Sequence, residues 1–167
     1  MGKTLSLHPN LVIYNMQRFY FDTSVFGGLF DKEFEEATLQ LFERVALGQV
    51  TCVFSDLTET ELLTAPEHVK QHFKSLAKEH IERVIATDEI LTLASKYVAE
   101  KVVGQTSFDD CIHIATATIY KVDILVSWNF KHIVNVYRIR GYNSVNLRSN
   151  YQSLEIRSPK EIIEYED

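Results

Sequence analysis

Short apolar runs alternate with longer amphipathic segments along most of the chain, and this alternation limits the possible folds more than any other feature of the sequence. The apolar runs at 18–22, 50–54, 81–86 and 122–127 have the length of strands, while the segments between them repeat apolar residues at helical spacing. Strands separated by helices form βαβ units, whose strands pair in parallel and whose helices cover both faces of the sheet. We therefore predict a three-layer α/β/α fold with a mostly parallel central sheet.

Capping residues and helix breakers locate the helices between these strands. Ser55 is a good N-cap for the acidic segment that follows it, and Pro66 closes that short helix. The glycine pair after the first strand is interpreted as part of a loop that leads into an amphipathic helix. Near the end of the chain we predict a helix that begins at Asn129 and runs toward Arg140, followed from Tyr142 by a short strand and an acidic end.

The 167 residues suit one domain with a sizeable core. We interpret residues 16–167 as that domain and residues 1–15 as an arm, either accessory or not native. No apolar run approaches the roughly 18 residues that span a bilayer, and the first residues lack the apolar centre of a secretory signal, so we expect no membrane association. Only two cysteines are present, Cys52 and Cys111, which favours a reducing cytoplasm over a disulfide framework.

Charge is distributed unevenly along the chain. The net charge of −6 argues against a protein that holds nucleic acid by bulk electrostatics. Residues 121–150, however, contain five basic side chains against Asp123 alone, a net charge of +4, which leaves −10 on the remainder. Aromatic rings interleave with these basic residues, a composition typical of surfaces that stack single-stranded bases, although packing in the core is the interpretation that we favour. The residues concerned are Trp128, Phe130, Tyr137 and Tyr142, with Lys131, Arg138 and Arg140.

Four polar side chains stand at the start or end of predicted elements. Asp22 follows the first strand, Glu61 lies in the short capped helix, Asp110 (next to Asp109) opens a later helix, and Asn129 follows the last of the four strands. Each one alone is more often a turn, cap or helix-dipole residue. Together they supply the oxygen ligands that Mg2+ and Mn2+ prefer, and a parallel sheet can bring such residues to one edge. Carboxylates that converge there would raise one another's pKa unless a cation lay among them.

The segments that carry these residues resemble a known family. FYFDTSVFGGLF, SDLTETELL, SFDDCIHIATATIYKVDILVSWNFKHI and EIRSPKEII together are similar to a PIN domain, a small metal-dependent nuclease fold that includes the VapC-type toxins of toxin–antitoxin pairs. No single motif is specific to that family. The resemblance depends on four motifs in the family order and spacing, which cover nearly all of the chain from Met16 onward.

The resemblance implies a set of site residues. Its first three acidic positions fall on Asp22, Glu61 and Asp110, and we interpret the adjacent Asp109 as a cap or an outer residue. The fourth position, an Asp in many members, is Asn129. An asparagine still offers an amide oxygen to a metal but removes one negative charge, so we expect one well-held ion and a weaker second one.

The resemblance also implies an activity and partners. We expect a Mg2+- or Mn2+-dependent endoribonuclease that hydrolyses RNA phosphodiesters with a metal-activated water and uses no covalent nucleophile. A small antitoxin protein would restrain it, and we expect a homodimer. The alternative is a degenerate PIN-like module that binds protein or RNA without cutting. A haloacid-dehalogenase-like phosphatase is discounted because Ser24 stands where that chemistry needs a second Asp.

Several other polar residues have simpler interpretations than catalysis. His68 and His72 have a spacing that can bind zinc, but no third ligand is evident, so we interpret them as exposed. His113 is one turn beyond Asp110 and could donate a hydrogen bond to a carboxylate, although a packed histidine is the interpretation that we favour. Cys111 is expected at an apolar helix position.

Two further pairs of residues are open to both a functional and a structural interpretation. Ser24 and Ser127 would orient water or phosphate, or would simply form a turn and a strand-end cap. Lys131 and His132 would contact phosphate, or would belong to a solvated helix start.

Overall fold

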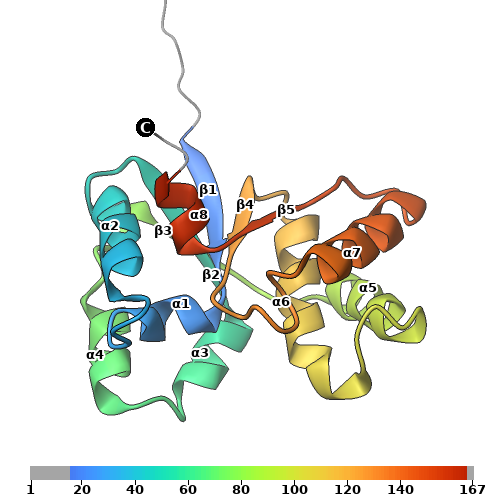
Figure 1. Cartoon of the computed structure of the whole chain (residues 1–167), viewed down its shortest axis with the longest axis horizontal. Helices are drawn as coiled ribbons and strands as arrows, with labels where there is room; N and C mark the ends of the chain where they lie inside the picture. The colour runs from blue at the N-terminus through green and yellow to red at the C-terminus, as the bar shows by residue number, and fades with distance from the viewer. Residues whose placement is uncertain (1–15, 165–167) are drawn as a thin grey trace, which may run out of the picture.

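The computed structural model describes residues 16–164, at the centre of which lies a five-stranded sheet (Figure 1). The strand order is β3-β2-β1-β4-β5 and every neighbouring pair is parallel, so the predicted sheet is confirmed and is parallel throughout. The strands are β1 (Gln17–Phe21), β2 (Val50–Ser55), β3 (Ile81–Val84), β4 (Ile124–Val126) and β5 (Glu155–Arg157).

Helices cover both faces of the sheet, as the three-layer prediction requires (Figure 1). One face carries α1 (Thr23–Gly28), α2 (Glu35–Ala46), α4 (Glu67–Ser75) and α8 (Pro159–Glu164). The other face carries α5 (Asp88–Ala99), α6 (Phe108–Ile119) and α7 (Val136–Arg148). The short helix α3 (Asp56–Leu62) directly follows β2, and two 3-10 turns lie at Lys78–His80 and Gln105–Ser107.

The side chains of β1 alternate between two separate cores. Phe19 and Phe21 pack with α1, α2 and α4, whereas Tyr20 packs with α5, α6 and α7. All three are at most 1% exposed. This alternation follows from the two-residue period of a strand, and each buried ring stabilises the fold by about 2–3 kcal/mol. Because of it, the Tyr20 hydroxyl lies on the side of α6.

The predicted start of α3 is confirmed by a reciprocal cap. The Ser55 hydroxyl accepts a hydrogen bond from the Thr58 backbone N–H (3.4 Å), and the Ser55 N–H donates to the Thr58 hydroxyl (3.3 Å). This capping box fixes the direction in which α3 leaves β2. Glu61 therefore lies in the last turn of a helix that starts at the carboxyl end of the sheet.

Three local predictions were wrong. Asn129 does not begin a helix: α7 begins at Val136, where the Asn135 side chain accepts hydrogen bonds from two backbone N–H groups. The helix also continues past Tyr142 to Arg148, because Tyr142 is fully buried in the core beneath it. The glycine pair after β1 belongs to the short helix α1 and not to a loop.

Two predictions concern membrane association and domain organisation. Among residues 16–164, no helix combines the length and the apolar character needed to cross a membrane. The division into an arm and a domain stays a prediction, since residues 1–15 lie outside the described part of the chain.

Candidate active site

Asp22 follows β1 at the switch point of the sheet, where the order of the strands reverses. β2 and β3 lie on one side of β1 and β4 and β5 on the other, and ligands of open parallel sheets bind at the carboxyl ends of the strands next to such a switch. The Asp22 backbone N–H donates to the Val126 carbonyl (3.0 Å), so it continues the pairing of β1 with β4. Asp22 is only 5% exposed although it carries a carboxylate.

Two serine hydroxyls hold the Asp22 carboxylate. Ser24 and Ser127 both donate to its Oδ2 atom, at 2.6 and 2.8 Å. Each hydroxyl also accepts a backbone N–H from the segment after β4, from Trp128 and Asn129 respectively. The two serines thus join β1 to the loop after β4, and their predicted contact with water or phosphate stays a prediction.

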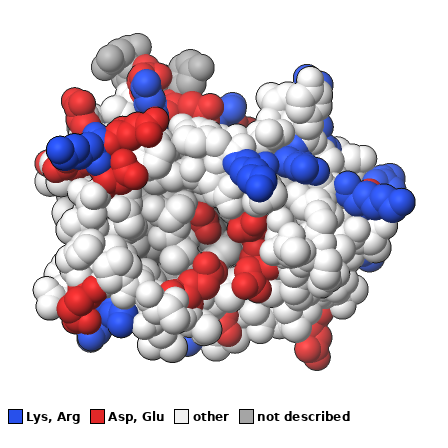
Figure 2. All heavy atoms as spheres, turned by 60° about the horizontal axis from the view of Figure 1, so that its bottom comes forward, with Lys and Arg blue, Asp and Glu red and all other residues white. Residues whose placement is uncertain are grey.

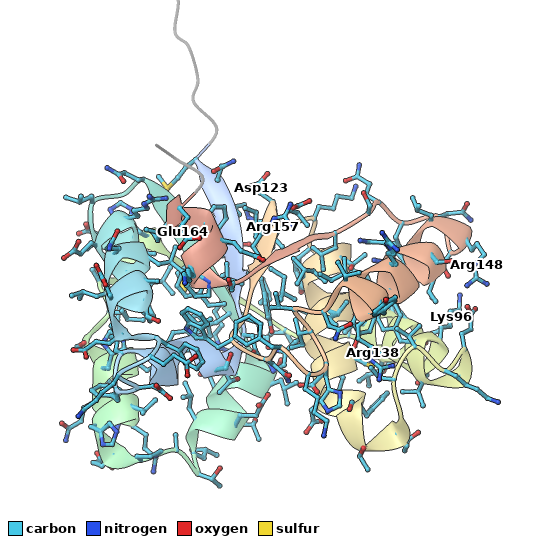
Figure 3. The ribbon with its side chains drawn as sticks, viewed as in Figure 1. Lys96, Asp123, Arg138, Arg148, Arg157 and Glu164 are labelled. Atoms are coloured by element: carbon cyan, nitrogen blue, oxygen red, sulfur yellow. The ribbon has the colours of Figure 1, made fainter. Side chains whose placement is uncertain are left out.

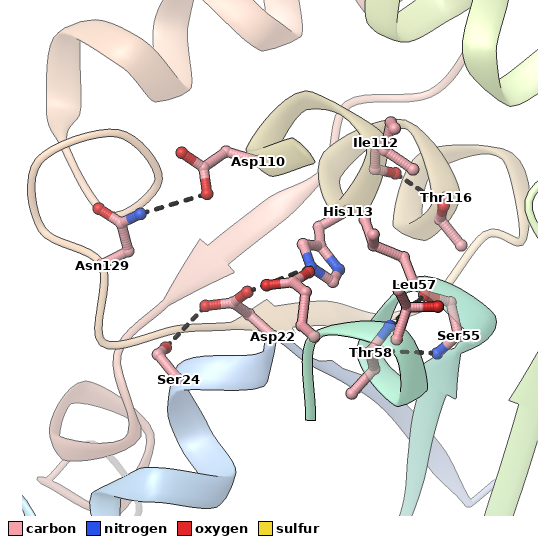
Figure 4. A network of polar contacts seen from close by, with 12 residues as sticks. Asp22, Ser24, Ser55, Leu57, Thr58, Asp110, Ile112, His113, Thr116 and Asn129 are labelled. Atoms are coloured by element: carbon pink, nitrogen blue, oxygen red, sulfur yellow. Dashed lines mark hydrogen bonds and ion pairs between the residues drawn. The ribbon is translucent and has the colours of Figure 1, made fainter. Parts of the chain in front are cut away.

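Glu61 reaches the same place from α3. Its Oε1 atom accepts a hydrogen bond of 2.5 Å from Nε2 of His113, which also lies 3.6 Å from Oδ1 of Asp22. The Glu61 side chain is 33% exposed, so it borders solvent while Asp22 lies beneath it. One imidazole nitrogen is therefore shared between Glu61 and Asp22, and Figure 4 shows the Asp22 carboxylate beside the His113 ring.

Asp110 approaches from the first turn of α6. Burial, together with the negative charges of Asp22 and Glu61, raises the pKa of Asp110 to about 6, although the nearby His113 acts to lower it. Such coupling requires the carboxylates to lie near one another. Figure 2 shows acidic side chains gathered around a hollow, with basic side chains on one part of its rim. Asp109, by contrast, is exposed.

Both the oxygen and the nitrogen of the Asn129 side-chain amide already form hydrogen bonds. Its Oδ1 atom accepts the backbone N–H groups of Lys131 (3.2 Å) and His132 (2.9 Å), and its Nδ2 atom donates to Oδ1 of Asp110 at 3.4 Å (Figure 4). The same loop is basic: burial, Lys131 and Arg138 together lower the pKa of His132. To act as the predicted metal ligand, the Asn129 oxygen would have to leave two backbone donors.

His113 is packed and also donates to a carboxylate, but the sequence did not reveal that its partners are Glu61 and Tyr20. It is 1% exposed, as expected for a packed histidine, and its Nδ1 atom lies 2.6 Å from the Tyr20 hydroxyl. Burial lowers the pKa of His113, but Tyr20, Glu61 and Asp22 outweigh that effect and raise the pKa well above its usual value. The signal in the sequence was its position three residues after Asp110, which places both on one face of α6.

The donors are of the kind that Mg2+ and Mn2+ bind, although their present positions do not form a complete site. Among residues 16–164, no three acidic, histidine or cysteine side chains are close enough to one another to hold a metal ion. The negative charges of Asp22 and Glu61 nevertheless act on Asp110, and no Lys or Arg within residues 16–164 forms an ion pair with any of the three. A divalent ion therefore fits the chemistry of the hollow, after small movements of side chains such as the part-exposed Glu61.

Trp128 anchors the loop that carries Asn129. Its ring stacks on Phe34 (centroids 4.1 Å apart), and its indole N–H donates to the Thr38 hydroxyl at 2.9 Å. Only glycine fits at position 28, because a Cβ atom there would lie 2.6 Å from both the Thr38 oxygen and the indole nitrogen. Trp128 is thus a packed residue of the fold and not an open stacking surface.

The other aromatic and basic residues after β4 do not form one platform. Tyr142 is fully buried, whereas Phe130 and Tyr137 are 49% and 80% exposed. Arg138 lies near the start of α7, and Arg148, which pairs with Glu100, lies at its other end (Figure 3). The predicted basic surface is therefore divided between the loop beside the site and the far end of α7.

The remaining histidine and cysteine candidates, apart from His68, are packing residues. His68 is exposed as predicted, whereas His72 is partly buried with its ring edge-on to Phe42 (centroids 4.7 Å apart). Cys111 is fully buried, and burial raises the pKa of its thiol to about 12. Cys52 is likewise buried and free.

Comparisons with known proteins agree with this geometry. The family profile described as PIN domain matches residues 19–131, more than half of the chain. The structure of VapBC2 from Rickettsia felis bound to a DNA fragment from their promoter matches with a TM-score of 0.54 and 13% identity, over 85% of this chain and 98% of that one. A toxin–antitoxin complex from Klebsiella pneumoniae matches with a TM-score of 0.50 and 19% identity, over 67% of this chain and 87% of that one. No curated protein sequence matches. At these identities the structural likeness concerns the fold.

Proposed function

Since the chain belongs to the PIN domain family, we propose that it is a Mg2+- or Mn2+-dependent endoribonuclease whose metal ligands are Asp22, Glu61 and Asp110. The observation that carries this proposal is the convergence of three carboxylates from β1, α3 and α6 at the carboxyl end of a parallel sheet. Carboxylates so close to one another destabilise each other unless a cation neutralises them. The preference for RNA over DNA comes from the family.

Each polar residue of the site has a role in this proposal. A bound divalent ion would activate water and stabilise the charge that develops on the phosphodiester. Asp22, held by Ser24 and Ser127, would contribute the most rigid ligand, because two hydroxyl donors fix its Oδ2 atom. Asn129 would orient Asp110 through its amide N–H and would come within reach of the metal only after releasing its backbone partners.

Partners and setting follow from the family and from the two structural matches. The Klebsiella pneumoniae structure is described as a toxin–antitoxin complex and the Rickettsia felis structure by the name VapBC2, and we extend a toxin–antitoxin association to this chain as a proposal. A small antitoxin would cover the acidic hollow, and the toxin would form a homodimer. The two buried, free cysteines are consistent with a reducing cytoplasm.

The direct test is cleavage of single-stranded RNA by the purified full chain. Reactions with Mn2+, Mg2+ or a chelator, on RNA and on DNA of the same sequence, should show cleavage of RNA that requires the metal. Asp110→Asn should abolish it, while the matched control Asp109→Asn, the same change on the exposed neighbour, should retain it. An intact RNA substrate in the presence of Mn2+ would overturn the proposal.

A second candidate function is a PIN-like module that binds without cutting. It is favoured by Asn129, which removes one carboxylate from the site, and by the net charge of −6. If the wild-type chain is inert and Asn129→Asp creates metal-dependent cleavage, the module replaces the nuclease.

A further inference from the structure

A line of hydrogen bonds runs through the interior from β2 to the acidic hollow. The Ser55 hydroxyl lies 2.8 Å from the Tyr20 hydroxyl, which lies 2.6 Å from Nδ1 of His113. Nε2 of His113 then donates to Glu61 at 2.5 Å. Ser55, Tyr20 and His113 are each at most 1% exposed, so this is a buried path that ends at a part-exposed carboxylate.

Every segment that supplies a carboxylate is joined by this path. Tyr20 is two residues before Asp22 on β1, Ser55 caps the helix that carries Glu61, and His113 lies one turn after Asp110 on α6. The alternation of β1 turns Tyr20 toward α6, while the Phe residues on either side face the opposite core. The three elements that meet at the hollow are therefore fixed to one another beneath it.

His113 is exceptional on its own helix. Residues 111–118 of α6 are all buried, and the neighbours of His113 in that stretch are mainly small or aliphatic. A buried imidazole is stable only when its nitrogens have partners, and an aliphatic side chain would pack at this position without that requirement. Because both nitrogens do have partners, and one is an acidic residue of the hollow, core packing alone does not explain a histidine here.

We propose that His113 is a positioning residue for the carboxylate site: its Nε2–H holds Glu61 beside Asp22, and Tyr20 holds the imidazole in that orientation. This inference rests on the metal-binding part of the proposed function. His113 acts through Glu61 and Asp22 and does not contact the substrate. It does not depend on the charge of the ring, because Nε2 donates to Glu61 whether Nδ1 accepts a hydrogen bond from the Tyr20 hydroxyl or donates one to it. Removal of a residue that hydrogen-bonds to a metal ligand typically weakens metal affinity by about 10–100-fold.

The test is Mn2+ binding to the full chain, measured by calorimetry beside thermal unfolding. His113→Leu should remain folded and bind Mn2+ about 10–100-fold more weakly. His113→Gln places a side-chain N–H near the former Nε2 atom and should restore most of the affinity. Tyr20→Phe keeps the imidazole but removes its support, so it should give an intermediate loss. Thr116→Val, a buried polar-to-apolar change one turn along the same helix, is the matched control and should bind as the wild type does.

The possible outcomes separate this proposal from the ribonuclease. A folded His113→Leu chain that binds Mn2+ as tightly as the wild type overturns the positioning role, as does a wild type that binds no Mn2+. Mn2+ binding that requires His113 in a chain that cleaves no RNA supports the positioning role and overturns the nuclease. If His113→Leu fails to fold, the decision falls to Tyr20→Phe and His113→Gln: unchanged affinity in a folded Tyr20→Phe chain overturns the proposal, and weakened affinity in it supports the proposal.

Discussion

The acidic hollow consists of two halves that are held very differently. Its inner pair, Asp22 and Glu61, receives hydrogen bonds of 2.5–2.8 Å from His113 and two serines. Its outer pair, Asp110 and Asn129, is joined by one contact of 3.4 Å between an amide and a carboxylate. Charge on the inner pair is therefore compensated by three close donors, while Asp110 receives only the longer contact from Asn129.

The pKa of Asp110 shows the consequence of this difference. Burial and the carboxylates of the inner pair raise it to about 6. A carboxyl group with a raised pKa favours either a proton or a cation beside it. Within the inner pair, Asp22 is held in place by its two serine donors, and the outer pair is the part of the hollow where a metal ion would change the electrostatics most.

The largest effect is expected from breaking the inner pair. Glu61→Gln keeps a partner for His113 but removes the charge, so metal-dependent cleavage of RNA should fall by about 100-fold or more. Glu59→Gln on the same helix is the matched control, since the Glu59 side chain is 40% exposed and pairs with Arg83. Initial rates with Mn2+ measure both variants. Equal losses in the two would show that Glu61 has no special place in the site.

Adding a second carboxylate to the outer pair should have the next largest effect. Asn129→Asp places two carboxylates at the present 3.4 Å contact, so the metal-free chain should lose about 1 kcal/mol of stability at neutral pH. The new charge should strengthen Mn2+ binding about 10-fold, which reverses the order of stability once Mn2+ is added. Chemical unfolding with and without Mn2+ measures both. Unchanged Mn2+ affinity would remove Asn129 from the metal site.

Removing the charge of the outer pair should stabilise the metal-free chain. The folded pKa of Asp110, about 6, lies above its unfolded value, so ionised Asp110 opposes folding at neutral pH and this cost disappears as the pH falls toward 4. After allowance for partial exposure, Asp110→Asn should raise the free energy of unfolding by about 1 kcal/mol at pH 7. Urea unfolding across pH 4–7 should show the gain shrinking with acidification. A gain that is independent of pH would contradict the electrostatic explanation.

The smallest effects are expected at the serines of the inner pair. Ser24→Ala or Ser127→Ala removes one of two donors to Oδ2 of Asp22 and should cost about 1 kcal/mol, a few-fold in the cleavage rate. The double variant should lose more than the sum of the single changes, because the carboxylate then has no hydroxyl donor. Cleavage rates of the three variants test this. A double variant no worse than the single ones would mean that Asp22 is fixed by other contacts.

Local signals predicted the elements well where the deciding contacts were themselves local. The Ser55 cap was predictable because its partner, Thr58, is three residues away. The start of α7 was not, because Asn129 and Asn135 offer the same cap chemistry. In the fold, Asn129 instead contacts Asp110, 19 residues away, and the neighbouring Trp128 contacts Thr38, 90 residues away, and the local sequence reveals neither contact.

The sequence by itself determined the parallel three-layer fold, since strands and helices differ in period, and it pointed to the four residues around the hollow. Their roles remain predictions. Only the tertiary structure decided which donor holds which carboxylate. His113 bonds Glu61 across 52 residues of chain, Tyr20 bonds His113 across 93, and Ser127 bonds Asp22 across 105. The periodicity of a sequence describes near neighbours, whereas these partners meet only because a parallel sheet gathers the ends of distant segments at one edge.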